Sequence, residues 1–366
     1  MRMRKEKDFL TLFDEKTGQY LRTGIIKEGR DTGEDPFMSS FPELLDVGIM
    51  GHCSHGKSGL CIKAGVECYQ DGLHAELPNM KLEDFKELVN QCRGKTYQFA
   101  LGGCGDPDQH EDFEEILHLC RDAGIVPNFT TSGFGMTEQI AGLCRKYCGA
   151  VAVSWYRSEY TLNAIGLLTA MRVKTSIHYV LSRKTVAEAL RRLREHSFPQ
   201  GINAVVFLLH KPVGLGSYEN MIRQDNGEFQ KLIEYIASED CGYKIGFDSC
   251  TIPALIGHTG NGHSGKIDAD SLDTCEGARW SAYITPDMKM LPCSFDNQEQ
   301  RWAVSLRTHS VEEAWNSEPF EDFRNHFRRV CPACPVRGQC MGGCPIRPEI
   351  VLCSERGRLH QAGVAL

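Results

Sequence analysis

The chain lacks the features of a membrane or secreted protein. No apolar run approaches the ~20 residues that a membrane-spanning helix needs. The first residues, MRMRKEKDF, contain no apolar segment of the kind that a secretory signal carries. We therefore predict a cytoplasmic protein that has no membrane partner.

A strong excess of one charge is also missing. The 366 residues include 41 Lys and Arg against 48 Asp and Glu, a net charge of −7. A mildly acidic chain has no general attraction for a polyanion, so no nucleic acid partner is expected. The length allows a large buried core.

Cysteine, in contrast, is abundant. The chain contains 17 cysteines, far more than a generic cytosolic enzyme of this size needs. Disulfides persist in oxidising compartments, and nothing in the sequence exports the chain. Clustered cytosolic cysteines indicate metal, chiefly zinc or iron–sulfur clusters, so we predict a protein that needs reducing, oxygen-poor surroundings.

From Leu45 to about Cys241 a strand, a turn and a helix follow one another repeatedly. The expected strands are 45–50, 97–101, 125–130, 150–155, 173–181 and 203–210. The expected helices are 81–92, 111–123, 137–147, 159–171, 186–196 and 226–238. This alternation predicts an α/β fold with a parallel sheet and crossover helices. Six units favour an open, partial (β/α)6 barrel over residues 41–242 rather than a closed eightfold one.

The flanking regions differ from this core. Residues 1–40 predict a hairpin on either side of the sequence EKTG, followed by a charged linker, KEGRDTGEDP. After residue 242 the alternation stops, with a seventh strand expected in GYKIGFDSC. Residues 243–366 then form a loop-rich, cysteine-rich domain.

Three cysteines follow the first strand of the core. In the segment 45–72, LDVGIMGHCSHGKSGLCIKAGVECYQDG, a buried strand leads into Cys53, Cys61 and Cys68. Ligands of parallel sheets bind at the carboxyl ends of the strands. Three thiolates there can hold one metal centre and leave a coordination position open, as a reactive site requires. The alternative at this point is three unrelated cysteines in a loop.

A glycine-rich loop follows the second strand. Gly102, Gly103 and Gly105 allow the backbone to approach a ligand closely, and Asp106 adds a carboxylate. No Lys or Arg lies in the loop, so the pattern suits an ammonium or amino-acid head group better than a phosphate. An ordinary glycine-rich turn is the alternative.

Polar side chains end several later strands. Ser132 and Ser154 offer hydroxyl groups that could hold a ribose, although serine at such a position also caps helices. Lys211 and Asp248 end strands at the same rim. They are our candidates for positioning the substrate or transferring a proton.

The C-terminal region contains the most regular cysteine spacing. Cys331 to Cys344 run as C-x2-C-x5-C-x3-C among prolines and glycines, and such a segment is held together by metal. A zinc ribbon is the main alternative. Cys275, Cys293 and Cys353 lie close in sequence, and this larger number favours two iron–sulfur clusters. Six other cysteines are expected to be small buried apolar residues, with an exception for Cys104 in the glycine loop: Cys92, Cys104, Cys120, Cys144, Cys148 and Cys241.

These motifs together resemble those of the radical S-adenosylmethionine (SAM) enzymes that carry a C-terminal SPASM domain, over about Leu45 to Cys353. The cysteines from Cys275 onward reproduce the SPASM pattern, except that Met288 stands where a glycine is usual. GGCGDP resembles the family's GGEP motif, TSG at 131–133 its TNG, and KPVG at 211–214 its sixth-strand ending. The first cysteines depart from the family spacing C-x3-C-x2-C, since here they run C-x7-C-x6-C before a matching CY ending.

The resemblance implies SAM and three [4Fe–4S] clusters. The SAM-binding cluster is implied at Cys53, Cys61 and Cys68. The SAM-binding loop comprises Gly102, Gly103, Cys104, Gly105 and Asp106. One auxiliary cluster is implied at Cys331, Cys334, Cys340 and Cys353. The other is implied at Cys275, Cys293 and Cys344, with Cys250 as the candidate fourth ligand or else an open coordination site.

The resemblance also implies an activity. Reductive cleavage of SAM gives a 5′-deoxyadenosyl radical, which takes a hydrogen atom from a ribosomally made precursor peptide and leads to a thioether or carbon–carbon crosslink. The implied partners are that peptide and an electron donor such as flavodoxin or ferredoxin. Forty residues before the core are too few for a winged-helix leader-binding domain, so a separate leader-recognition protein or another surface is expected.

Three alternatives stay open at this point. One is a radical SAM enzyme that modifies a small molecule. Another is a sulfatase-maturing enzyme, against which Ser294 counts because that branch typically has an aspartate there. The third is a metal-binding adaptor without catalytic activity.

Overall fold

A ten-stranded sheet forms the centre of the molecule. The computed structural model describes residues 1–259, 267, 272–329, 331, 334, 340–350 and 352–353. Seven strands lie parallel and neighbour one another in chain order. They are β6 (Leu44–Met50), β7 (Gln98–Gly103), β8 (Val126–Thr131), β9 (Val151–Ser154), β10 (Thr175–Leu181), β11 (Ala204–Leu209) and β12 (Ile245–Phe247).

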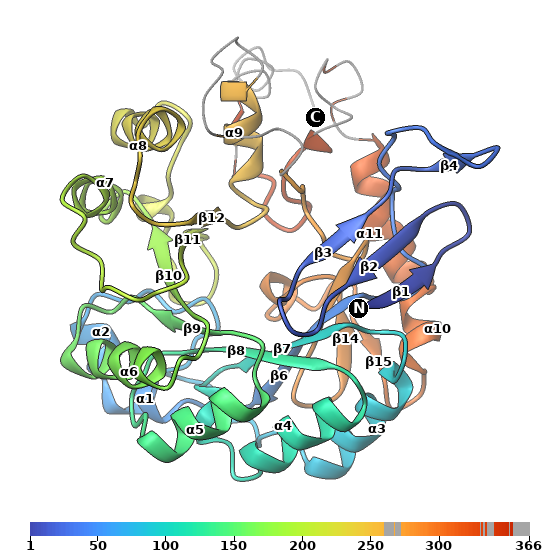
Figure 1. Ribbon diagram of the computed structural model, residues 1–366, viewed down its shortest axis with the longest axis horizontal. Coiled ribbons are helices and arrows are strands. Elements are labelled where there is room, and N and C mark those ends of the chain that lie inside the picture. The colour runs from blue at the N-terminus through green and yellow to red at the C-terminus, as the bar shows by residue number, and fades with distance from the viewer. Residues whose placement is uncertain are drawn as a thin grey trace.

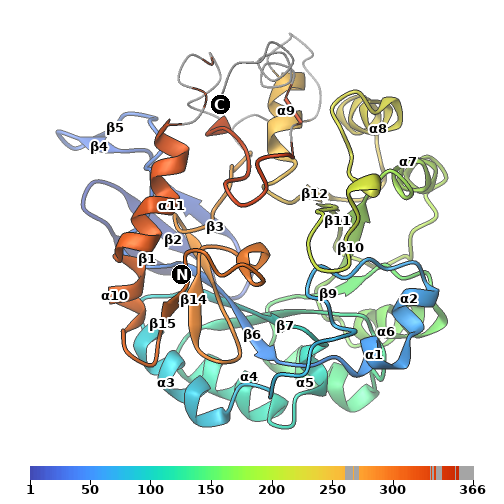
Figure 2. The ribbon, with the colours of Figure 1, turned by 180° about the vertical axis from the view of Figure 1, so that it is seen from behind.

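Six crossover helices cover the outer side of this curved sheet, as Figures 1 and 2 show. They are α3 (Leu82–Cys92), α4 (Phe113–Asp122), α5 (Glu138–Tyr147), α6 (Glu159–Ala170), α7 (Val186–Arg194) and α8 (Gly227–Ser238). Each buries an apolar stripe on the sheet, as Phe113, Ile116 and Leu117 do in α4. The predicted partial barrel of six strand–helix units is confirmed.

Aromatic residues join the helices to the sheet. The ring of Phe85 in α3 meets that of Phe99 in β7 edge to face at 6.0 Å, and Phe113 meets Phe129 of β8 in the same way at 5.4 Å. The remaining cysteines take part in this packing. Those that are buried, as predicted, are Cys92, Cys120, Cys144 and Cys241, while Cys148 is half-buried against the core.

The C-terminal region extends the sheet beyond β6. Strand β13 (Ser281–Ile284) pairs with β6 in parallel, and β14 (Lys289–Leu291) and β15 (Val304–Ser305) continue antiparallel. The sequence did not predict these strands, because runs of two to four residues carry no readable periodicity. Helix α9 (Ile252–Thr259) precedes these strands in the chain, and α10 (Val311–Trp315) and α11 (Glu318–Arg329) follow them.

The N-terminal region forms two small sheets. The predicted hairpin is present as β2 (Leu10–Phe13) and β3 (Tyr20–Arg22), and β1 (Arg2–Lys5) adds a third strand. The prediction of an unstructured linker is wrong in part, because β4 (Ile26–Lys27) and β5 (Arg30–Asp31) pair within that segment. The first sheet packs on the barrel, where Phe13 stacks on Tyr97 at 5.1 Å.

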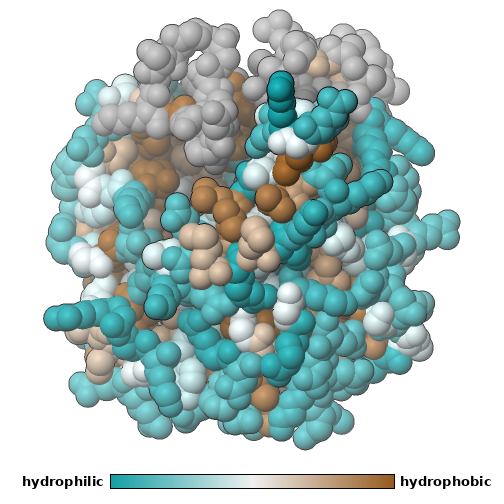
Figure 3. All heavy atoms as spheres, turned by 45° about the vertical axis from the view of Figure 1, so that its right-hand side comes forward, coloured by the Kyte–Doolittle hydropathy of each residue, from teal (hydrophilic) through white to brown (hydrophobic). Residues whose placement is uncertain are grey.

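None of the helices that the structure describes combines the length and the apolar character needed to cross a bilayer. On the face shown in Figure 3, hydrophilic residues predominate.

Candidate functional site

The loop that carries the first three cysteines is partly helical. Helix α1 (Ser54–Ser58) begins after Cys53, whose Sγ accepts a hydrogen bond from the Gly56 amide at 3.1 Å. Gly59 adopts a φ of 72° between α1 and α2 (Leu60–Lys63), and this left-handed conformation favours glycine. Cys61 lies buried in α2. The long spacing between the first cysteines is therefore taken up by two short helices.

A cavity of about 230 Å³, which we name the rim cavity, lies at the carboxyl ends of β6 and β7. It brings together most of the residues that the sequence singled out in the core. Those that line it are Cys53, Cys61, Cys68, Gly102, Gly103, Cys104, Gly105, Asp106 and Ser154. Four thiols from two separate loops therefore face one space.

Ser132 does not line the rim cavity but holds a residue that does. Its amide and its hydroxyl donate to the two carboxylate oxygens of Asp106, each at 2.6 Å. Burial raises the pKa of Asp106 and also that of its neighbour Asp108, the latter to about 7. We infer that Ser132 positions Asp106 rather than binding a ribose.

The glycines of the loop serve two different purposes. A Cβ on Gly103, whose φ is 113°, would overlap the Met50 carbonyl oxygen, and one on Gly105 would overlap the His52 carbonyl oxygen. The close packing of the chain therefore requires these two glycines. A Cβ on Gly102 would meet nothing within 4 Å, although the residue lines the cavity. Space beside Gly102 is thus left for a ligand.

The thiols of the rim cavity are close enough to influence one another. Burial is the main cause that raises the pKa of Cys53 to about 11, and the neighbouring Asp106, Cys68 and Cys61 contribute to this increase. Within the described residues, no three side chains converge tightly enough to hold a single metal ion. A [4Fe–4S] cluster presents several iron atoms to separate thiolates, so several thiols spread around one cavity fit a cluster better than one ion.

Lys211 and Asp248 form an ion pair with each other. Lys211 Nζ lies 2.8 Å from Asp248 Oδ2, and Asp248 also accepts hydrogen bonds from Leu209 N (3.1 Å) and Thr251 Oγ1 (2.7 Å). Burial lowers the pKa of Lys211, but the carboxylate of Asp248 outweighs it and raises the pKa well above the usual range. Lys211 is therefore held as an ammonium group and has no lone pair with which to accept a proton.

The C-terminal cysteines meet in a second place. A small cavity is lined by Cys250, Cys275, Cys340, Cys344 and Cys353. Two sets of interacting thiols can be followed among the C-terminal cysteines. Cys250 and Cys293 each interact electrostatically with Cys275 and Cys344. Cys340 interacts with Cys331, Cys334 and Cys353, and Cys340 and Cys353 also line the cavity beside the first set.

Packed side chains help to place Cys275. The buried guanidinium of Arg279 donates to the Cys275 carbonyl at 2.9 Å and to the Phe37 carbonyl at 2.8 Å. Burial raises the pKa of the Cys275 thiol to about 12. A metal bound there must therefore displace a tightly held proton, so cluster assembly is coupled to deprotonation.

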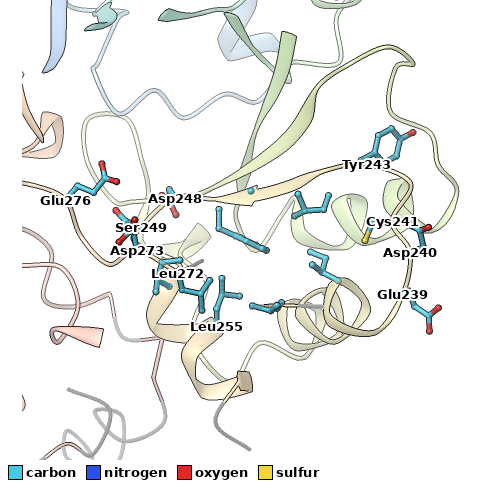
Figure 4. A pocket seen from close by; sticks show the side chains of 16 residues that line it. Glu239, Asp240, Cys241, Tyr243, Asp248, Ser249, Leu255, Leu272, Asp273 and Glu276 are labelled. Carbon is cyan, nitrogen blue, oxygen red and sulfur yellow. The ribbon is translucent and has the colours of Figure 1, made fainter. Parts of the chain in front are cut away.

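A larger cavity of about 600 Å³, the edge groove, runs along β12, which pairs only with β11 in the described sheet. Figure 4 shows Glu239, Asp240 and Tyr243 toward one end, and Asp273 and Glu276 toward the other. Among the predicted site residues, only Asp248 lines this groove.

Among the residues of the rim cavity that sequence reasoning missed are three that bear on its polarity, Asp46, Gln70 and Tyr283. One signal was available, because Asp46 is a charged residue inside an apolar strand. Nothing in the sequence marks the other two, since Tyr283 reaches the cavity only through the pairing of β13 with β6.

Comparison with known proteins agrees with this geometry. A family model for an iron–sulfur cluster-binding domain, SPASM, matches residues 275–340. SuiB from Streptococcus suis, in a structure bound to the precursor peptide SuiA, is 14% identical with a TM-score of 0.66, over 85% of this chain and 73% of SuiB. SuiB bound to S-adenosylmethionine gives a TM-score of 0.62 at 14% identity, over 85% of this chain and 72% of SuiB.

A second protein shows the same likeness. The structure of anSMEcpe with bound AdoMet and the Cp18Cys peptide is 17% identical with a TM-score of 0.60, over 84% of this chain and 90% of that one. The chain thus shares the fold of these two proteins and its residues 275–340 match the SPASM model, so the resemblance predicted from the sequence is confirmed for the fold and for this domain.

Proposed function

We propose that the protein is a radical SAM enzyme that modifies a peptide. The observation that carries this proposal is the rim cavity, where the thiols of Cys53, Cys61 and Cys68 face the glycine-rich loop and Asp106. A second group of cysteines, in a region that matches an iron–sulfur domain, supports the proposal.

The proposal assigns the clusters as the resemblance does. Cys53, Cys61 and Cys68 would hold the cluster that binds SAM, and this cluster would supply the electron for reductive cleavage of SAM to a 5′-deoxyadenosyl radical. The grouping of the C-terminal thiols supports two auxiliary clusters, with Cys250 as the fourth ligand of the first.

The chain's own residues bind the cosubstrate and exclude water. Gly102 leaves room beside the backbone, and Asp106, fixed by Ser132, accepts hydrogen bonds from an ammonium group. His55 lies between the rings of Phe134 and Tyr156, at 5.3 and 5.5 Å. This aromatic wall keeps solvent away from a reactive radical.

A peptide substrate is supported by the relatives. The SuiB structure contains a precursor peptide, and the anSMEcpe structure contains the Cp18Cys peptide. We propose a ribosomally made precursor peptide as the substrate, a thioether or carbon–carbon crosslink as the product, and flavodoxin or ferredoxin as the electron donor.

Anaerobic reconstitution tests the proposal. We expect iron and sulfide for three [4Fe–4S] clusters and formation of 5′-deoxyadenosine from SAM after reduction with dithionite. Absence of 5′-deoxyadenosine from a fully loaded, reduced protein would overturn the enzyme assignment.

A pair of cysteine variants provides the control. Cys61→Ala should lose one cluster and all 5′-deoxyadenosine formation, because it removes one of the three thiolates. Cys120→Ala, at a fully buried position in α4, should keep the full cluster content and the formation of 5′-deoxyadenosine. Short peptides translated from reading frames beside the gene then distinguish a peptide substrate from a small molecule, through the mass change of the product.

A further inference from the structure

An acidic side chain without a partner lies inside the barrel. Asp46 stands on β6 between Leu45 and Val47, which are fully buried against the helices, so its side chain points to the opposite face of the sheet. There it lines the rim cavity. Burial alone raises the pKa of Asp46, to about 6, because no described residue donates a hydrogen bond or a positive charge to it.

Two more unpartnered polar groups face the same space. Tyr283 is the register partner of Asp46 in the parallel β13–β6 pair, so both side chains lie on one face of the sheet. Its Oη is buried and has no hydrogen-bond partner among the described residues. Gln70 Nε2 also lacks a well-aligned hydrogen bond, although the Gln70 side chain interacts with Tyr283, and Gln70 Oε1 accepts from Asn297 at 2.9 Å. Buried polar atoms are normally paired, so a bound molecule is the natural partner here.

The missing partner of Asp46 is a cation. The groups that interact electrostatically with it are neutral or acidic: Tyr69, Tyr283, Glu276 and Cys293. No described basic residue contributes to the pKa of Asp46, and two buried ones are engaged elsewhere, Lys211 with Asp248 and Arg279 with backbone carbonyls. A desolvated carboxylate gains most from a charged group that also donates hydrogen bonds.

We propose that Asp46 and Tyr283 form a subsite for a positively charged side chain, lysine or arginine, of the peptide substrate. The inference rests on the proposed function, because the subsite opens into the cavity assigned to SAM. Asp46 accepts the N–H bonds of the cation and Tyr283 adds its hydroxyl oxygen. The Gln70 amide, which lies beside Tyr283, donates to a carbonyl oxygen of the same peptide.

The experiment compares two small probes of the same shape. The full chain is reconstituted anaerobically and saturated with SAM, and binding of N-acetyl-lysine methylamide and N-acetyl-norleucine methylamide is measured by calorimetry. We expect the lysine probe to bind at least ~10-fold more tightly, the gain of one charged hydrogen bond. Asp46→Asn should abolish this preference. Asp240→Asn, which removes an exposed acid of the edge groove, should retain it.

A second measurement separates a binding role from a structural one. In the absence of probe, Asp46→Asn should raise the melting temperature, because it removes a half-buried charge that has no partner among the described residues. The lysine probe should raise the melting temperature of the wild type but not that of the variant. A residue that only supports the fold would show a decrease on substitution.

Several results would overturn the subsite. The first is equal or undetectable binding of the two probes by the wild type. The second is an unchanged preference for the lysine probe in Asp46→Asn. The third is displacement of SAM by the lysine probe, which would assign Asp46 to the binding of SAM itself. An arginine probe shows which cation is preferred. These measurements do not involve 5′-deoxyadenosine, so loss of the subsite and loss of the proposed activity are distinguishable.

Discussion

The two cysteine regions differ in what holds them. In the first, the packed chain itself positions the residues: Cys53 caps α1, Cys61 lies within α2, and the Cys68 carbonyl accepts from Leu215 N at 2.9 Å. In the second, the described residues 341–350 form turns and bends, without helix or strand. We infer that protein packing prepares the first site, whereas bound clusters provide much of the structure of the second.

Removal of iron should produce the largest difference in stability between the two cysteine regions. After anaerobic chelation, we expect amide hydrogen exchange in 340–350 to accelerate by ~10³-fold or more, because the metal ligands are the main cross-links there. Residues of α3–α5 should keep their protection. Equal protection in loaded and stripped protein would show that packing also holds the C-terminal region.

Two adjacent glycines sharpen the comparison within the first region. Gly103→Ala should lower the free energy of unfolding by about 2–4 kcal/mol, because the φ of 113° and the Met50 carbonyl both exclude a Cβ. Urea denaturation of the protein loaded with its iron–sulfur clusters measures this change in the free energy of unfolding.

Gly102→Ala is the matched control. Its Cβ meets open space, so the stability should change by less than about 0.5 kcal/mol, while SAM affinity falls because the methyl group enters the cavity. An unchanged SAM affinity in Gly102→Ala would contradict the assignment of this space to the ligand.

Arg279 tests whether the second region depends on metal alone. Arg279→Lys should destabilise the protein by about 1–3 kcal/mol, since lysine cannot reach both the Cys275 and the Phe37 carbonyls. Thermal denaturation of the iron-free protein is the measurement. Arg183→Lys, at an exposed position, should be nearly neutral. No difference between the two variants would mean that packing contributes nothing to the placement of Cys275.

Much of the fold could be predicted because it follows local patterns. The six strand–helix units appear in the sequence as apolar runs and 3.6-residue stripes, and the structure places their boundaries close to those predicted. The positions of Cys53 and the glycine loop at one rim followed from the rule that parallel strands end at the same edge.

The parts that could not be predicted depend on contacts between distant segments. Strand β13 exists because the edge of β6 offers a hydrogen-bonding ladder, and that pairing alone brings Tyr283 beside Asp46. The Lys211–Asp248 ion pair arises in the same way, because the two residues follow neighbouring strands. It fixes to each other the two residues that were our candidates for positioning the substrate or transferring a proton.

The sequence by itself determined the layered α/β core, the burial of cysteines on helix faces and the two clusters of thiols, since each of these depends on spacing along the chain. Only the tertiary structure decided which polar groups remain without partners in the rim cavity. The physical reason is that hydrogen bonding of a buried group depends on everything packed around it, and strand register sets those neighbours.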